Sequence, residues 1–153
     1  AGDPVLDSYK VFEVDGVKIA IVGITTPESF TKSTPSYFQD ENGNYIYGID
    51  GGTDGEAIYT AVQNAIDAAS AEADYVIALG HLGVDESSQP WTSREVIANT
   101  TGLDAFIDGH SHTTIPMEEV TDEGHCRGRH HHHPAPHRRE SGRSDPRRRG
   151  EGH

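Results

Sequence analysis

Apolar residues are grouped along this chain in short runs that predict β-strands. Runs at 9–14 and 17–24 are rich in β-branched residues and flank Asp15-Gly16. An Asp-Gly pair between two such runs is typical of a type I′ hairpin turn, because both central residues of that turn need positive φ. The second run is apolar almost throughout after Lys18, which predicts a central strand covered on both faces.

Two helices are predicted by capping boxes, in which a Thr and a Glu three residues later satisfy free backbone N–H groups. The first box precedes apolar residues spaced by three and four over 58–69, which form one stripe along a helix. The second precedes a short helix for which Gly102 is placed as the C-terminal stop. The two boxes are Thr53–Glu56 and Thr92–Glu95.

Apolar runs at 74–79 and 103–107 predict two further strands, so strands and helices alternate after residue 17. This order predicts an α/β fold in which the strands pair in parallel through right-handed crossovers. We interpret 25–52, which is rich in Thr, Pro, Ser, Asn and Gly, as a long connection, and loops of that length are often functional. In parallel sheets, ligands bind beyond the carboxyl ends of the strands.

Histidines follow two of these predicted strands. His81 comes after the run 74–79, and His110 and His112 come after the run 103–107. If the strands are neighbours, the imidazoles meet at one edge of the sheet, and an extended His110-x-His112 segment directs both rings to one side. Neutral imidazole is a good ligand for zinc, manganese, cobalt or iron. The competing interpretation is a set of hydrogen-bonding loop histidines.

Three acids near these histidines have two interpretations each. Asp108 is either a ligand paired with His110 or the cap of the turn that follows the strand. Asp85 and Glu86 either orient a histidine ring or are solvated acids at the start of a helix. Ser111 has no acid and base pattern around it, so the sequence does not support a Ser-His-Asp triad.

Charge divides the chain in two. Residues 1–124 contain four Lys and Arg against 22 Asp and Glu, whereas 125–153 contain eight Arg against three acids. The acidic part argues against nucleic-acid binding, because phosphates need a basic face. No apolar run has membrane-spanning length, no signal peptide is visible, and the single cysteine, Cys126, excludes an internal disulfide.

Residues 125–153 have a composition that cannot bury a core. They hold eight arginines, seven histidines and three prolines with Ala135 as the only aliphatic side chain, so we expect a disordered tail. It is either a natural metal-binding or basic tail or an end that is out of frame or derived from a vector. The histidine run 130–133 would still bind soft divalent metals. This gives an alternative function for the chain, as a non-catalytic metal-binding fragment.

Two motifs together resemble a known family. Leu79-Gly80-His81-Leu82-Gly83 followed by residues 107–113, Ile-Asp-Gly-His-Ser-His-Thr, is similar to the closing motifs of calcineurin-like metallophosphoesterases. The resemblance is to the branch of bacterial 5′-nucleotidases and UDP-sugar hydrolases, and it extends over about residues 9–115. The segment 23–28, Gly-Ile-Thr-Thr-Pro-Glu, is also similar to that branch.

This resemblance implies a fold, an activity and a set of ligands. The fold is a β-sandwich flanked by helices, and the activity is hydrolysis of nucleoside 5′-monophosphates or nucleotide sugars by two divalent ions, with Mn, Zn or Co expected. By resemblance, His81 and His110 bind one ion and His112 the other. The branch is secreted, periplasmic or attached to the cell wall.

The chain departs from the family in three motifs. The upstream Asp-x-His, Gly-Asp-x-x-Asp and Gly-Asn-His-Glu or -Asp patterns are absent from their proper places, so the chain contains no catalytic histidine of the family. We therefore expect residues 1–124 to be the C-terminal part of a catalytic domain, inactive alone and binding at most one ion weakly. An upstream half of the domain would be its partner, and without it half a sandwich exposes an apolar sheet face.

Overall fold

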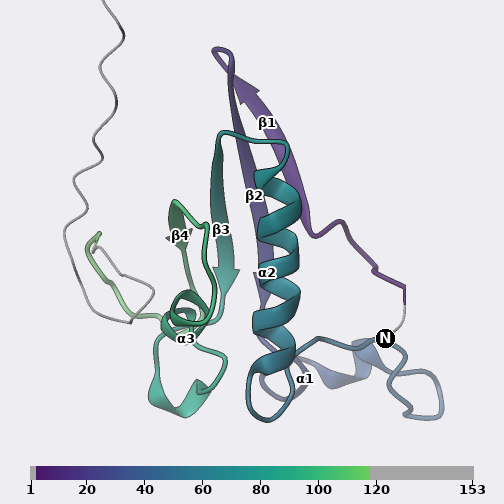
Figure 1. Cartoon of the computed structure of the whole chain (residues 1–153). Coiled ribbons are helices and arrows are strands. Elements are labelled where there is room, and N and C mark those ends of the chain that lie inside the picture. Colours follow the sequence, from purple (N-terminus) through teal and green to yellow (C-terminus); the bar gives the residue numbers. More distant parts are fainter. Residues whose placement is uncertain (1–2, 118–153) are drawn as a thin grey trace, which may run out of the picture.

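The computed structural model describes residues 3–117, in which four strands form one mixed sheet in the order β1-β2-β3-β4 (Figure 1). This is an α/β fold, as predicted. The predicted tail at 125–153 lies outside the described residues. The elements in chain order are β1 (Tyr9–Val14), β2 (Val17–Thr25), α1 (Ser29–Lys32), η1 (Pro35–Phe38), α2 (Glu56–Ser70), β3 (Tyr75–His81), η2 (Glu86–Ser88), α3 (Ser93–Ala98) and β4 (Ala105–Ile107).

The predicted hairpin is confirmed. β1 and β2 pair antiparallel, and the turn between them has positive φ at both of its residues, 51° at Asp15 and 81° at Gly16. Positive φ at both central positions is the requirement of a type I′ turn, which matches the twist of the two strands it joins. The hairpin fixes β2 inside the sheet, between β1 and β3.

The predicted parallel pairing is also confirmed. β2 pairs parallel with β3 so that Thr25 lies opposite His81, and β3 pairs parallel with β4 so that Leu79 lies opposite Ile107. The carboxyl ends of the three strands therefore lie at one end of the sheet, where α1 and α3 also lie (Figure 1). The segments that follow β2, β3 and β4 meet there.

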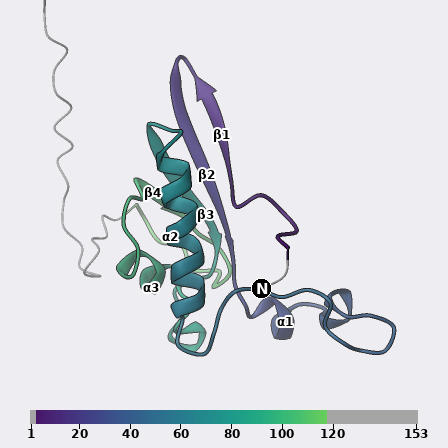
Figure 2. The same ribbon diagram turned by 45° about the vertical axis from the view of Figure 1, so that its right-hand side comes forward.

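The core lies between α2 and one face of the sheet (Figure 2). Side chains alternate between the two faces of a strand, so every second residue of β2 and β3 reaches the helix. The matching stripe on α2 consists of Ile58, Val62, Ala65, Ile66 and Ala69. The buried residues of the sheet that meet it are Ala20, Val22, Ile24, Val76 and Ala78.

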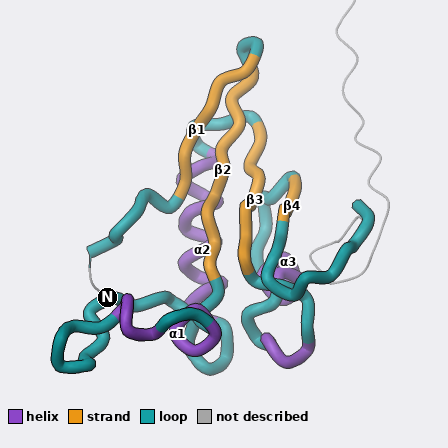
Figure 3. The backbone as a smooth tube through the Cα atoms, turned by 180° about the vertical axis from the view of Figure 1, so that it is seen from behind, coloured by secondary structure: helices purple, strands orange, loops and turns teal. Residues whose placement is uncertain are grey.

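The opposite face of the sheet is apolar and open. Figure 3 shows the strands in front of α2, and no helix of the described residues crosses this face. Leu79 is 53% exposed and Ile107, its neighbour in register, is 58% exposed. The prediction that β2 is covered on both faces is therefore wrong within residues 3–117, and the expected exposed sheet face is present.

Two predicted helix boundaries are wrong. α2 begins at Glu56 with Gly55 in the left-handed region at its N-cap, and Asp54, not Thr53, accepts the hydrogen bond from the Glu56 N–H. α3 ends at Ala98, well before Gly102. Gly102 has a φ of +96° and lies against the Ile66 side chain, so it serves the packing of a loop on α2. In the second predicted capping box, Thr92–Glu95, the half made by Thr92 is confirmed, because its hydroxyl accepts a hydrogen bond from the Glu95 N–H.

None of the helices in the described part of the chain is both long enough and apolar enough to cross a membrane.

One substitution in the core under α2 and one on the open face of the sheet test whether only one face of the sheet is buried. Ile66→Ala removes a side chain that is 1% exposed and is expected to lower the free energy of unfolding by about 2–5 kcal/mol. Ile107→Ala, the control, is expected to cost less than about 1 kcal/mol because Ile107 is already in solvent. Urea denaturation measures both, and equal losses would contradict the one-sided core.

Candidate metal site

Two of the three predicted ligands lie together at the carboxyl edge of the sheet. His81 is the last residue of β3, and His110 follows β4. Their ring centroids are 4.9 Å apart with an interplanar angle of 65°. Parallel pairing of β3 with β4 is the cause, because it brings the two segments beyond the strand ends to the same place.

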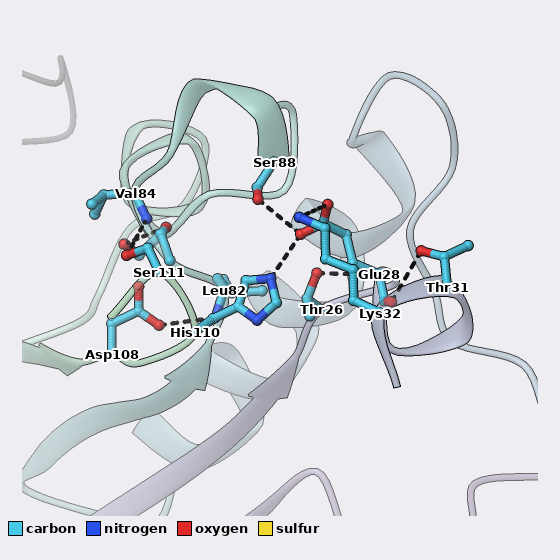
Figure 4. Close-up of polar contacts among 12 residues, drawn as sticks. Thr26, Glu28, Thr31, Lys32, Leu82, Val84, Ser88, Asp108, His110 and Ser111 are labelled. Carbon is cyan, nitrogen blue, oxygen red and sulfur yellow. Dashed lines mark hydrogen bonds and ion pairs between the residues drawn. The ribbon is translucent and has the colours of Figure 1, made fainter. Parts of the chain in front are cut away.

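Two side chains of the loop after β4, Asp108 and Ser111, accept hydrogen bonds from backbone N–H groups of the loop after β3 (Figure 4). The Asp108 carboxylate accepts from the Leu82 N–H at 2.9 Å and from the Gly109 N–H at 2.8 Å. The Ser111 hydroxyl accepts from the Val84 N–H at 3.3 Å. Asp108 therefore caps the turn after the strand, which is the second of its two interpretations. Its bond to the Leu82 N–H also holds the two loops together and so brings His110 close to His81.

The close approach of the two loops depends on glycine. A Cβ at Gly109 would lie 3.2 Å from Nδ1 of His81, and a Cβ at Gly80 would lie 2.6 Å from the Phe106 ring. At Gly80 a side chain would force the Phe106 ring to move, and at Gly109 the His81 ring would have to give by a few tenths of an ångström. The Gly-His pairs at 80–81 and 109–110 thus let the backbone pass beside the rings.

A buried carboxylate that the sequence did not assign completes the cluster. Glu28, in the segment after β2, is 8% exposed, and its Oε2 lies 2.8 Å from Nε2 of His110. The Ser88 hydroxyl donates to the same oxygen at 2.8 Å, and Lys32 Nζ lies 2.6 Å from Oε1. Figure 4 shows these three partners converging on Glu28 from α1, from η2 and from the loop after β4.

The environment of Glu28 favours its ionised form. Burial by itself would raise the pKa of this carboxyl group, but the hydrogen bonds from Lys32, Ser88 and His110 outweigh burial and lower the pKa below its ordinary value. Hydrogen bonds given to a carboxylate stabilise its charge. The cluster therefore contains a fixed negative charge in contact with an imidazole.

Glu28, and not Asp85 or Glu86, is the acid that bonds a histidine ring. Asp85 is the N-cap of η2 and Glu86 lies in its first turn, which agrees with their interpretation as helix-start acids. Glu28 carries a sequence signal that we did not use: it follows a parallel strand, as His81 and His110 do. Its partners Ser88 and His110 are 60 and 82 residues away along the chain, which hid the contact.

The third predicted ligand, His112, is not joined to this pair. Within residues 3–117 no group of three or more His, Cys, Asp or Glu side chains lies close enough to hold a metal ion. The prediction that His110-x-His112 is extended is wrong, because φ is 88° at His110 and 56° at His112. The role of His112 as a ligand, like that of His81 and His110, stays a prediction.

Comparison with known proteins places this chain in a family. The family described as bacterial capsule synthesis protein PGA_cap matches residues 6–132. The chain belongs to this family, and with it to the calcineurin-like metallophosphoesterases of the 5′-nucleotidase branch. The family resemblance seen in the sequence is thereby confirmed, and the family is one of metal-dependent phosphoesterases.

Two relatives and one solved structure are similar to the chain. The trifunctional nucleotide phosphoesterase protein YfkN of Bacillus subtilis is 29% identical over 74% of this chain, and a 5′-nucleotidase of Diplobatis ommata is 31% identical over 69%. The sulfate thiohydrolase SoxB of Thermus thermophilus shares the fold over 80% of this chain and 19% of its own, at 23% identity and a TM-score of 0.57. The chain spans 7% and 15% of the two relatives.

The lowered pKa of Glu28 predicts a pH dependence of stability. The pKa of Glu28 in the folded state lies below the ordinary value of 4.5. The ionised carboxylate therefore stabilises the folded state above that pH, and this stabilisation is lost as the pH falls toward the folded-state pKa. Glu28→Gln is expected to lower stability at neutral pH and to flatten this acid limb of the curve.

Urea denaturation at a series of pH values measures the effect. Glu13→Gln, which removes one negative charge from an exposed position on β1, is the control and is expected to keep the wild-type profile. An unchanged acid limb in Glu28→Gln would show that the cluster does not hold the carboxylate in its charged form.

Proposed function

We propose that this chain supplies histidine ligands to the metal centre of a 5′-nucleotidase-type phosphoesterase. The observation that carries the proposal is the contact between the His81 and His110 rings beside an ionised, buried Glu28. Two imidazoles in contact, one of them hydrogen-bonded to a carboxylate, is the usual arrangement around a protein-bound divalent metal. The donor set therefore fits part of such a site.

The nitrogen donors favour zinc, manganese or cobalt over calcium or magnesium, which prefer oxygen. As the family resemblance implies, His81 and His110 hold one ion and His112 contributes to the second. A bound ion of this kind supplies a Lewis acid and lowers the pKa of its water. The protein's own part is to keep the imidazoles in place, through Asp108 on one side and Glu28 on the other.

The proposed substrates are phosphate esters of nucleotides, such as nucleoside 5′-monophosphates or nucleotide sugars. Support comes from the two relatives, whose names are those of a nucleotide phosphoesterase and a 5′-nucleotidase. As part of the same proposal, and as the family resemblance implies, the protein is secreted, periplasmic or attached to the cell wall.

We further propose that the chain is inactive by itself and needs another segment with the remaining ligands. Two imidazoles without a bridging carboxylate hold at most one ion, and weakly. Within the described residues no third ligand joins His81 and His110. An upstream half of the catalytic domain, bearing the Asp-x-His and Gly-Asn-His motifs, is the proposed partner.

Phosphate release from AMP with manganese tests this inactivity. The full chain is expected to release no more phosphate than buffer with manganese alone, because the family's three upstream motifs, with their metal ligands and catalytic histidine, are absent from the sequence. Malachite green detects the phosphate. Turnover that His112→Ala abolishes would show that the chain is a complete enzyme.

The histidines at 125–153 support a second candidate, metal binding without catalysis. Zinc uptake by the full chain is compared with uptake by a His81→Asn, His110→Asn double variant, which leaves those seven histidines intact. We expect the wild type to bind one zinc ion more than the double variant in equilibrium dialysis. Equal uptake would assign all binding to the C-terminal histidines and reject the folded site.

A further inference from the structure

The Glu28 carboxylate receives donors on both of its oxygens. Lys32 occupies Oε1, and Ser88 and His110 meet at Oε2, each at 2.8 Å. An ionised carboxylate can only accept hydrogen bonds. Nε2 of His110 must therefore carry a proton in order to make its bond to Oε2.

A protonated Glu28 is the only alternative that would reverse this bond. In that case the carboxyl group would donate to a bare Nε2 of His110. The ammonium of Lys32 on one oxygen and the hydroxyl of Ser88 on the other both favour the carboxylate. The contact thus defines which nitrogen of His110 is the donor.

We propose that Glu28 is a positioning residue that fixes His110 in the Nε2–H tautomer and leaves Nδ1 as the only nitrogen that can bind a metal. The tautomer follows from the hydrogen bonds of the protein alone. The consequence for metal binding rests on the proposed function. Carboxylates that hold ligand histidines in this way typically contribute about 10–100-fold to metal affinity.

Glu28 is itself held rigidly, as a positioning residue requires. Its backbone N–H donates to the Thr26 hydroxyl at 3.2 Å, and Thr26 is 1% exposed. Ser88, which shares Oε2 with His110, is 2% exposed. Lys32 is half exposed, and an ion pair with such a side chain is worth little for stability by itself. The buried members of the cluster are thus Glu28, Thr26 and Ser88, and the His110 side chain is 15% exposed.

Nitrogen-15 NMR of the metal-free full chain reads the tautomer directly. Long-range proton–nitrogen correlations, at mildly alkaline pH, distinguish a protonated ring nitrogen from a bare one, and the spectrum of His110→Gln identifies the His110 signals. The expected wild-type result is a protonated Nε2 and a bare Nδ1. Glu28→Gln is expected to give a mixture of the two tautomers.

Lys32→Met is the matched control, because it removes the partner of Oε1 and leaves the His110 bond on Oε2 intact. We expect this variant to keep the wild-type tautomer. A merely structural Glu28 would stabilise the fold without selecting a tautomer, so the nitrogen signals separate the two roles.

A zinc titration, followed through the NMR signals of His110, measures the predicted effect of Glu28 on metal affinity. A chelator sets the free zinc concentration, so that uptake by the other histidines of the chain does not alter it. Glu28→Gln is expected to need about 10–100-fold more free zinc than the wild type to half-saturate His110, and Lys32→Met less than about threefold more.

Each outcome decides a separate point. A wild-type His110 protonated on Nδ1, or a Glu28→Gln variant with unchanged tautomer and unchanged zinc affinity, overturns the inference. A wild-type His110 with the expected tautomer but no response to zinc rejects the proposed function and keeps the positioning role. If Glu28→Gln does not fold, the wild-type tautomer alone decides, since Nε2–H supports the inference and Nδ1–H overturns it.

Discussion

Parallel pairing of β2, β3 and β4 is the constraint on which the rest of this structure depends. It places three strand ends at one edge, and Glu28, His81 and His110 all lie at or just beyond those ends. The residues are distant in sequence, so no local propensity could bring them together. The hairpin formed by β1 contributes indirectly, because it holds β2 inside the sheet where β3 can pair with it. The cluster is therefore a consequence of topology before it is a matter of side-chain chemistry.

The parts of the fold that follow from short-range patterns, or from the one rule that parallel strand ends share an edge, could be predicted. The Asp15-Gly16 turn, the strands and the contact of His81 with His110 follow from turn chemistry, apolar runs and the rule that parallel strand ends share an edge. Helix boundaries were less predictable, because Asp54 and Thr53 offer competing caps and the left-handed Gly55 decides between them. Glu28 was missed because its partners come from three different segments.

The open face of the sheet and the pair of contacting histidines favour the same proposal. One face buries a full core against α2, while Leu79 and Ile107 remain exposed on the other. In the same way, the rings of His81 and His110 are in contact, whereas within residues 3–117 no group of three or more possible metal ligands lies together. Both features agree with a C-terminal part of a metallophosphoesterase catalytic domain. Glu28 contacts the His110 ring itself, and Asp108 joins the loop that carries His110 to the loop after β3.

The central claim is that Glu28 directs Nδ1 of His110 toward a metal shared with His81. A crystal structure of the zinc-soaked protein, with anomalous scattering measured at the zinc edge, tests it most directly. The account predicts a zinc peak about 2.0–2.1 Å from Nδ1 of His110 and from one ring nitrogen of His81, with the bond from Nε2 to Glu28 intact. A zinc ion bound to Nε2 of His110 with Glu28 displaced, or no zinc at either ring, would contradict it.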